Sequence, residues 1–299
     1  MNDVRKKRLH LLNASGNARA EQLDWDGAAS RYLECLRGCR SEGYTALESR
    51  VLYNLGLCFL NQGRFDGAVE FYTTCVDSCG AMEDNIKRLS LNDLANAYTL
   101  MGRWSEAVEI YRRSLEIADA SGDEGARWQT LMNLANLYHE QGELKRAAEL
   151  YQQVIDATMD LGLMRAEAAA RNNLGDVLIA QELRAQAMAL YQQSLHLSRN
   201  CGDRRIEATA VGNLANAHRL LGRWDIALLL CQESLSLWRI LADVHGEGEM
   251  LELLGTMYSD RQQRAEATLY WREALCKLPA CSSAHERVRR QLSSMGGNA

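Results

Sequence analysis

The sequence has few residues that interrupt helices, since it contains one proline in 299 residues. Proline ends or kinks a helix, so a chain of this length with a single proline can be helical nearly throughout. No segment shows the alternating pattern that predicts a β-strand. The hydrophobic share of 47% and the charged share of 24% are those of a folded protein. We therefore expect an all-α fold.

Long apolar segments are also missing. No run of eighteen apolar residues occurs, which excludes a membrane-spanning helix. The positive charges near the N-terminus are not followed by the apolar segment of a secretory signal. We expect no membrane contact and a cytoplasmic location.

Positive charge does not predominate, since 39 acidic residues face 34 lysines and arginines. The formal net charge is −5, and the basic clusters are confined to residues 5–8 and 287–290. A protein that binds a phosphate backbone needs a cationic face, so nucleic acid is not an expected partner. We interpret both clusters as solvated helix ends.

What the sequence does contain is a repeat of about 40 residues. A leucine followed by glycine or alanine recurs along the chain, 39 residues apart once and then 40 residues apart four times. A constant period of this length is typical of repeat architectures. The leucines are Leu55, Leu94, Leu134, Leu174, Leu214 and Leu254.

A second set of residues keeps the same period. An alanine lies thirteen residues after each leucine, an aromatic residue or a substitute four positions further, and an aliphatic residue eight positions further. Steps of four and eight put these side chains on one face of a second helix. The alanines are Ala28, Ala68, Ala107, Ala147, Ala187, Ala227 and Ala267.

Each repeat is therefore predicted to be two antiparallel helices, joined by a turn such as residues 101–104. Glycine in the turn supplies the positive φ that ends the first helix. Nearby polar residues are expected to cap the second helix, as Asp66, Ser105 and Asp225 can. Neither helix buries its apolar face alone, so the units must stack on one another.

We count seven repeats in residues 1–279. The first repeat is degenerate, and Gln262 replaces the turn glycine of the seventh. Residues 283–286 form a capping-box pattern that opens a last helix ending near Leu292. We therefore predict a C-terminal capping helix and tail in residues 280–299.

At these residues the chain resembles the tetratricopeptide repeat superfamily, over about residues 4–278. The resemblance implies a right-handed superhelical solenoid of seven helix-turn-helix repeats. The long repeats are similar to those of Pins/LGN-type adaptors, which bind extended partner peptides. The Gα-binding motifs expected beyond the repeats of such an adaptor are absent, so only the repeat type is carried over. Similar arrays also occur as sensor regions of bacterial regulators.

The resemblance further implies that the first helices line a concave groove, into which the residue two positions after each leucine points. Most of these residues are asparagine, a mediocre helix former whose amide can pair with a partner's backbone. The alternative is that they are consensus residues that bond the adjacent helix. The positions are Asn17 (by phase), Leu57, Asn96, Asn136, Asp176, Asn216 and Thr256.

The same phase adds further candidates to the groove. They are Arg50, Tyr53, Asn92, Gln129, Met132, His139, Asn172 and Arg219. Toward the C-terminus the positions become acidic at Glu249, Glu252 and Asp260, which predicts a groove that runs from mildly basic to acidic. An uncorrelated polar face is the alternative. A second asparagine just before the leucine, as at Asn54 and Asn213, is interpreted as packing between helices.

No set of residues in the sequence has the spacing of a catalytic or metal site. Cys35 with Cys39 and Cys75 with Cys79 suggest zinc ligands, but Cys75 aligns with small residues in the other repeats, where cysteine acts as a small hydrophobe. The six histidines are scattered, and no phosphate loop is present. We expect unbridged cysteines, no metal, no cofactor and no enzyme activity.

The fifth repeat departs from the pattern. Arg171 occupies a position that is leucine or valine in the other repeats, and Glu182 replaces the turn glycine. An arginine in an apolar position must pair or extend to solvent. The fifth repeat is interpreted either as degenerate or as a hinge or specific contact.

We expect a protein-protein interaction scaffold that holds a partner peptide or protein segment in its groove, acting as a monomer or weak dimer. The alternative is a ligand- or peptide-sensing regulatory domain of a signalling or transcription-control system. The identity of the partner is not encoded in any motif of the sequence.

Overall fold

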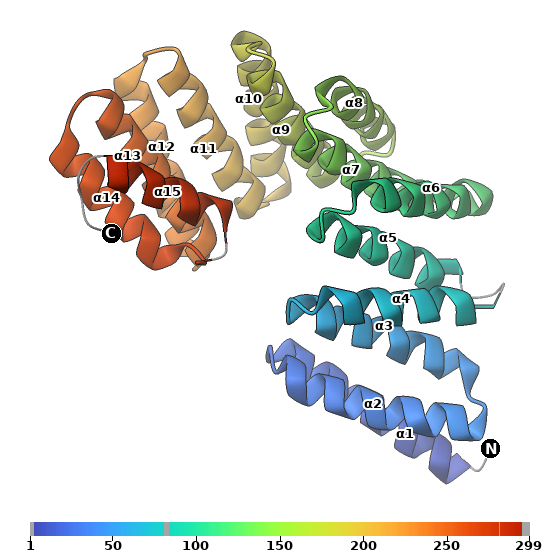
Figure 1. Ribbon diagram of the computed structural model, residues 1–299. Helices are drawn as coiled ribbons and strands as arrows, with labels where there is room; N and C mark the ends of the chain where they lie inside the picture. The colour runs from blue at the N-terminus through green and yellow to red at the C-terminus, as the bar shows by residue number, and fades with distance from the viewer. Residues whose placement is uncertain (1–2, 81–83, 281, 295–299) are drawn as a thin grey trace. The chain divides into compact units, whose positions relative to one another are not determined.

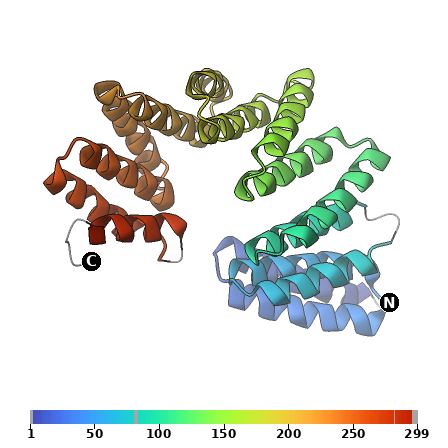
Figure 2. The same ribbon diagram turned by 45° about the horizontal axis from the view of Figure 1, so that its top comes forward.

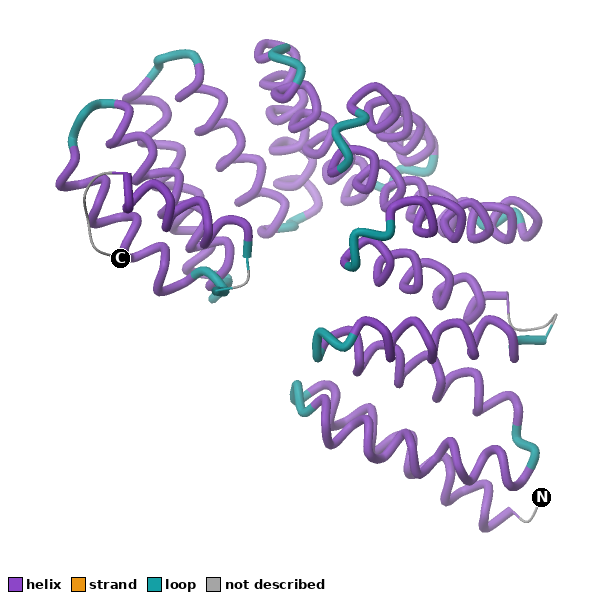
Figure 3. The backbone as a smooth tube through the Cα atoms, in the orientation of Figure 1, coloured by secondary structure: helices purple, strands orange, loops and turns teal. Residues whose placement is uncertain are grey.

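The computed structural model describes residues 3–80, 84–280 and 282–294, and these residues form only helices and loops (Figure 3). The all-α prediction is therefore confirmed. None of the described helices has the length and apolar composition needed to cross a membrane.

The chain divides into two compact units, residues 1–141 and residues 142–299 (Figure 1). The helices of the first unit are α1 (Asp3–Glu21), α2 (Trp25–Glu42), α3 (Thr45–Asn61), α4 (Phe65–Ser78), α5 (Asp84–Leu100), α6 (Trp104–Ser121) and α7 (Glu124–Glu140). Those of the second unit are α8 (Leu144–Asp160), α9 (Met164–Ala180), α10 (Arg184–Cys201), α11 (Arg204–Leu220), α12 (Trp224–Ile240), α13 (Val244–Asp260), α14 (Arg264–Lys277) and α15 (Ser283–Ser294).

Within each unit every helix packs against the next one along the chain, as Figure 2 shows for the helical hairpins. The odd-numbered helices up to α13 are the first helices of the seven predicted repeats, and the even-numbered helices are the second. The tandem-hairpin fold is thus the one that the period predicts.

A close contact between the two helices of a repeat explains the small residue after each leucine. A Cβ atom added at Gly56 would lie 2.4 Å from the ring of Tyr72, and one added at Gly175 would lie 2.4 Å from the ring of Tyr191. Both tyrosines are at most 1% exposed. The missing side chain lets an aromatic ring of the second helix pack directly on the backbone of the first.

The predicted caps of the second helices are wrong. Asp66, Ser105 and Asp225 lie inside the first turn, because only one residue separates the positive-φ glycine from the helix. The residues at the N-cap positions are arginines without a capping side-chain bond, namely Arg64, Arg103 and Arg223. Aspartates cap three first helices, at Asp123, Asp203 and Asp243, and the second helix α2, at Asp24.

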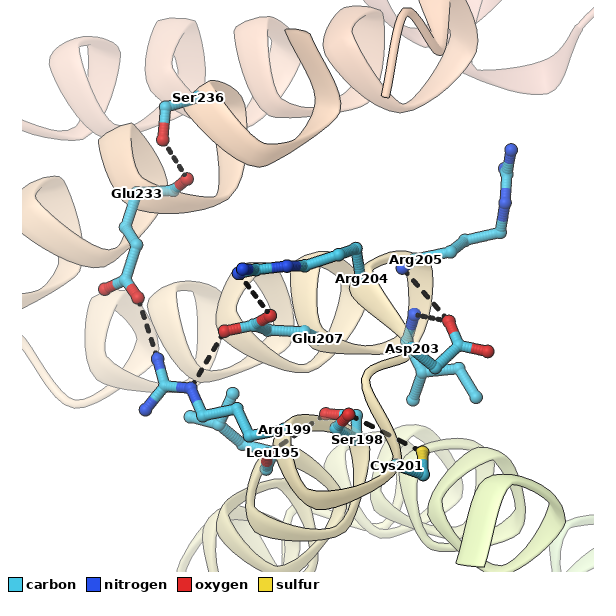
Figure 4. A network of polar contacts seen from close by, with 11 residues as sticks. Leu195, Ser198, Arg199, Cys201, Asp203, Arg204, Arg205, Glu207, Glu233 and Ser236 are labelled. Carbon is cyan, nitrogen blue, oxygen red and sulfur yellow. Dashed lines mark hydrogen bonds and ion pairs between the residues drawn. The ribbon is translucent and has the colours of Figure 1, made fainter. Parts of the chain in front are cut away.

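An ion pair recurs across the turn between repeats, always over eight residues. Arg199 on α10 donates to Glu207 on α11 at 2.8 Å and to Glu233 at 2.9 Å (Figure 4). Arg239 and Glu247 form the same pair at 2.9 Å. These pairs join the end of one repeat to the start of the next.

The same ion pair explains Arg171. Met159 stands where the next two repeats have Arg199 and Arg239, so Glu167 has no arginine eight residues before it. Arg171 takes over, because its Nε donates to Glu167 at 2.8 Å and its Nη1 donates to Gln193 at 2.7 Å. Compared with the following repeats, the arginine and the apolar residue stand at each other's positions. A cation therefore still lies beside the buried Glu167.

The C-terminal helix α15 packs on α13 and α14. Ala284, Val288 and Leu292 are buried in the cluster that contains Trp271. Arg287 donates to both carboxylate oxygens of Glu252, at 2.8 and 2.9 Å. The hydroxyl that caps α15 belongs to Ser282, which accepts from the backbone N–H of His285 at 3.1 Å, and not to Ser283 as the capping-box pattern predicted.

We predict that Arg171→Leu lowers the free energy of unfolding by about 3 kcal/mol, because it leaves the buried Glu167 carboxylate without a cation. The double substitution Met159→Arg with Arg171→Leu should recover most of this loss, since it restores the arrangement of the following repeats. Urea unfolding of the three proteins measures the effect. A double variant as unstable as the single one would show that the exchange is not compensatory.

We predict that deletion of residues 280–299 destabilises the second unit by several kcal/mol, because it exposes apolar surface around Trp271. A matched pair of substitutions avoids truncation. Val288→Asp places a charge at a fully buried position and should lower the melting temperature, whereas Arg289→Asp at an exposed position should not. Equal melting temperatures for the pair would exclude a packing role for α15.

Candidate functional site

The first helices form the more closely packed side of each unit. α3 contacts α5 and α5 contacts α7 in one unit, and α9 contacts α11 and α11 contacts α13 in the other. Second helices of neighbouring repeats show no comparable contact among the described residues of either unit. We call the exposed surface of the first helices (α1, α3, α5 and α7 in one unit; α9, α11 and α13 in the other) the inner face of that unit.

The residues two positions after the repeat leucines lie on the inner face and bond to their own repeat. The Oδ1 atom of Asn17 accepts from the Tyr32 hydroxyl at 2.7 Å, and Asp176 accepts from the Tyr191 hydroxyl at 2.7 Å. Asn96 accepts from the Tyr111 hydroxyl. These bonds are the ones that the packing alternative predicts. Asn17 is exposed, and Asn96, Asn136, Asp176 and Asn216 are partly exposed.

Asn216 differs because its repeat has Cys231 in place of the tyrosine. Its Oδ1 atom accepts from the Nε atom of Arg219 at 3.1 Å. Arg219 in turn pairs with Asp260 on α13 at 2.7 Å. Arg219 therefore connects two first helices and is only partly exposed.

The asparagines that precede the leucine bridge neighbouring first helices. The Nδ2 atom of Asn54 lies 3.5 Å from Asn13 and 3.3 Å from Asn17, measured to their Oδ1 atoms. Asn213 repeats this arrangement, with distances of 3.4 Å to Asn172 and 2.8 Å to Asp176. Two clusters of the same geometry thus occur, one in each unit, and they hold the amide groups in place.

Several groove candidates lie between helices. Asn92 and Asn172 are each 4% exposed and Met132 is 9% exposed, so these side chains face the neighbouring helix and not the open surface. The Oδ1 atom of Asn92 accepts from Thr130 on α7 at 3.2 Å. The hydroxyl of Tyr53, which is half-buried, is bonded to Asp93.

Three further groove candidates have side chains that are exposed or partly exposed. Arg50 and Gln129 are exposed on the inner face, and His139 is partly exposed. Sequence phase alone did not separate these residues from the buried ones, because both columns lie on the same side of the helix and only the position of the neighbouring helix decides which is covered.

The cysteines proposed and rejected as zinc ligands have a packing role. The Sγ atom of Cys75 donates to the backbone carbonyl of Ser49 at 3.1 Å. Ser194 at the equivalent position donates to the carbonyl of Ala168 at 2.8 Å, over the same 26 residues. At this position cysteine and serine therefore have the same role. Each is a small side chain that donates a hydrogen bond from the second helix of a repeat to the first.

A small cavity of about 140 Å³ opens between α11 and α13. Its lining includes Thr209, Asn213, Trp238, His245 and Glu249. Sequence reasoning missed it, although one pattern marks it. Trp238 stands where the first five repeats have a small residue, and it fits because Gly246 beside it has no side chain.

The comparisons with known proteins agree with this geometry. Three family models described as tetratricopeptide repeat match residues 13–79 and 132–203, residues 88–159 and residues 208–244. The chain belongs to the tetratricopeptide repeat superfamily. A comparison with curated protein sequences gave no significant match.

Solved structures share the fold at low sequence identity. The apo form of the quorum sensor NprR from B. thuringiensis has a TM-score of 0.75 at 16% identity, covering 91% of this chain and 76% of that one. The apo form of RapI has a TM-score of 0.69 at 13% identity, with coverage of 96% and 99%. A tetratricopeptide repeat protein from Parabacteroides merdae has a TM-score of 0.68 at 15% identity, with coverage of 96% and 98%.

The carboxyl group of Asp176, on the inner face, is harder to ionise than a free aspartate. Burial raises the pKa of Asp176 to about 6, against the hydrogen bond from Tyr191, and the charge of Glu249 adds to the rise. A raised folded-state pKa means that the folded protein binds the proton more tightly than the unfolded chain. The stability gained is therefore present below about pH 4 and is lost as the pH rises through about 6.

We predict that Asp176→Asn raises the free energy of unfolding at pH 7 by on the order of 2 kcal/mol and reduces the fall in stability between pH 4 and pH 6. Asparagine is the residue at this position in four of the other repeats. Asn17 shows that its Oδ1 atom can accept from both the tyrosine and the bridging asparagine. Urea unfolding over this pH range measures the effect. An unchanged pH profile would show that Asp176 does not titrate in it.

Proposed function

We propose that this protein binds extended segments of a partner protein on the inner face of each of its two units. The supporting observation is the pair of amide clusters around Asn54 and Asn213, in which each amide is held by bonds to the preceding repeat. A polar group that is already fixed loses little side-chain entropy when it binds.

The chemistry of the inner face suits a backbone. An extended peptide presents unpaired N–H and C=O groups, and an amide side chain can pair with either kind. Among the described contacts the Oδ1 atoms of Asn54 and Asn213 accept no bond from the protein, so each leaves an acceptor available at a partly exposed position. Asn96, Asn136 and Asn216 add amides two residues after the repeat leucine, so the ladder proposed from the sequence remains part of this proposed site.

The alternative function is a sensory region of a larger regulatory system. It is supported by two solved relatives of this fold, NprR, which is described as a quorum sensor, and a signal transduction ATPase with a tetratricopeptide repeat sensor from Pyrococcus horikoshii. The latter has a TM-score of 0.65 at 12% identity, and this chain covers 45% of it. Both functions begin with the same event, which is binding of a segment to the inner face.

The test uses a displayed library of random peptides and matched variants. Arg50→Ala with Gln129→Ala removes two exposed inner-face groups, for which we expect binding of the selected peptides to weaken by about tenfold, since each hydrogen bond is worth about 0.5–1.5 kcal/mol. Arg113→Ala with Gln153→Ala removes the same residue types from exposed positions on the second helices α6 and α8, and should leave binding unchanged.

Neither pair of substitutions is expected to change the melting temperature, because the structure gives none of these four side chains a bonded partner among the described residues. Equal losses of affinity in the two double variants, or full affinity in the inner-face variant, would contradict the proposal. A difference in affinity confined to the inner-face pair would support it.

A further inference from the structure

Two columns of side chains run along the inner faces, one residue before and two residues after the repeat leucine. Amides dominate both columns, and an acid occurs in each of them once. The first column is Ala14, Asn54, Asp93, Asn133, Asn173, Asn213 and Leu253. The second is Asn17, Leu57, Asn96, Asn136, Asp176, Asn216 and Thr256.

Asp176 sits in a copy of a neutral cluster. Its Oδ1 atom accepts from the Tyr191 hydroxyl at 2.7 Å and from the Nδ2 atom of Asn213 at 2.8 Å. Asn17 makes the same two bonds in the first unit, with Tyr32 and Asn54. The fold therefore needs only an acceptor here, and an asparagine supplies it without charge.

The surroundings of Asp176 do not neutralise the carboxylate. No lysine or arginine in the described part of the chain forms an ion pair with it, and the charge of Glu249 raises its pKa further by repulsion. Burying a carboxylate without a cation is unfavourable. Asp176 is nevertheless partly exposed on the inner face.

Asp93 shows the same features in the first unit. It accepts from the Tyr53 hydroxyl and, at 3.3 Å, from the Nδ2 atom of Asn96. Burial again raises its pKa, and no described lysine or arginine pairs with it. Tyr72 beside it is fully buried, and its hydroxyl has no partner because Leu57 replaces the asparagine that other repeats provide.

Two other acids of the inner face are already paired with arginines. Glu252 accepts two bonds from Arg287, and Asp260 is 2.7 Å from Arg219. Asp93 and Asp176 differ from Glu252 and Asp260, because no lysine or arginine of the described chain pairs with them.

We propose that Asp93 and Asp176 each hold a cationic group of a segment bound to the inner face of its own unit, a lysine or arginine side chain or a free amino group. The proposal rests on the function proposed above. A cation from the partner would complete each cluster, because it would offset the charge of a carboxylate at a partly exposed position. The two acids thereby select basic segments, while the neutral amides of the same columns bind any backbone.

The test uses a protein that carries both Asp93→Asn and Asp176→Asn, and compares it with a charge-matched control. The control is Asp77→Asn with Asp156→Asn, at exposed positions on the second helices α4 and α8. The probes are pools of peptides of about ten residues, in which one position is held as lysine, arginine, glutamate or norleucine. Fluorescence anisotropy measures the affinity of each protein for each pool.

We expect the wild-type protein and the control to bind the lysine and arginine pools about tenfold more tightly than the norleucine pools. The Asp93→Asn, Asp176→Asn protein should bind the basic and norleucine pools equally, and should melt no earlier than wild type. A melting temperature that is kept or raised shows that the lost preference is not a loss of fold.

The outcomes separate this proposal from the proposed function. Peptide binding by the wild-type protein without any preference for basic pools, or a preference that survives in the double asparagine protein, would overturn the assignment of Asp93 and Asp176 and leave peptide binding intact. If the wild-type protein binds none of the pools, the proposed function itself fails, and this inference fails with it.

Discussion

The packing of a second-helix aromatic ring on the first-helix backbone is the contact on which the rest of the structure depends. It requires a small residue after the repeat leucine, and Gly56 and Gly175 show how little space is left. The contact sets the distance between the two helices of a repeat. It also carries the tyrosine hydroxyl to the inner face, where it meets the polar residue one position beyond the small one.

The bonds that hold the proposed binding surface on the inner face are the same bonds that join the helices of the fold. The hydroxyl of Tyr191 holds Asp176, and Asn213 then bridges Asp176 to the next first helix. The same bonds recur around Asn17 in the other unit. Amide side chains that the fold already holds are suited to binding a backbone, because binding requires no further ordering. Fold and proposed function therefore use the same atoms.

Departures from the repeat are informative in different ways. Arg171 looked like a breakdown of the pattern, yet it replaces the cation missing at Met159 and keeps Glu167 neutralised. Asp93 and Asp176 look conservative, since they have the shape of asparagine, but no residue of the described chain compensates for their charge. A departure from the repeat pattern that a neighbouring residue offsets, as at Arg171, has a structural explanation. A departure that no neighbouring charge offsets, as at Asp93 and Asp176, is the kind expected at a functional site.

The sequence by itself determined the helical class, the seven repeats and the last helix, because a period of 40 residues with small and aromatic side chains in phase allows only stacked helical hairpins. Only the tertiary structure decided which polar residues are open. The repeat phase places both Asn92 and Gln129 on the groove side of their helices. In the structure Asn92 is 4% exposed, whereas Gln129 is exposed. The difference arises because a neighbouring helix covers one column and not the other, and residue spacing along one helix contains no information about where its neighbour lies.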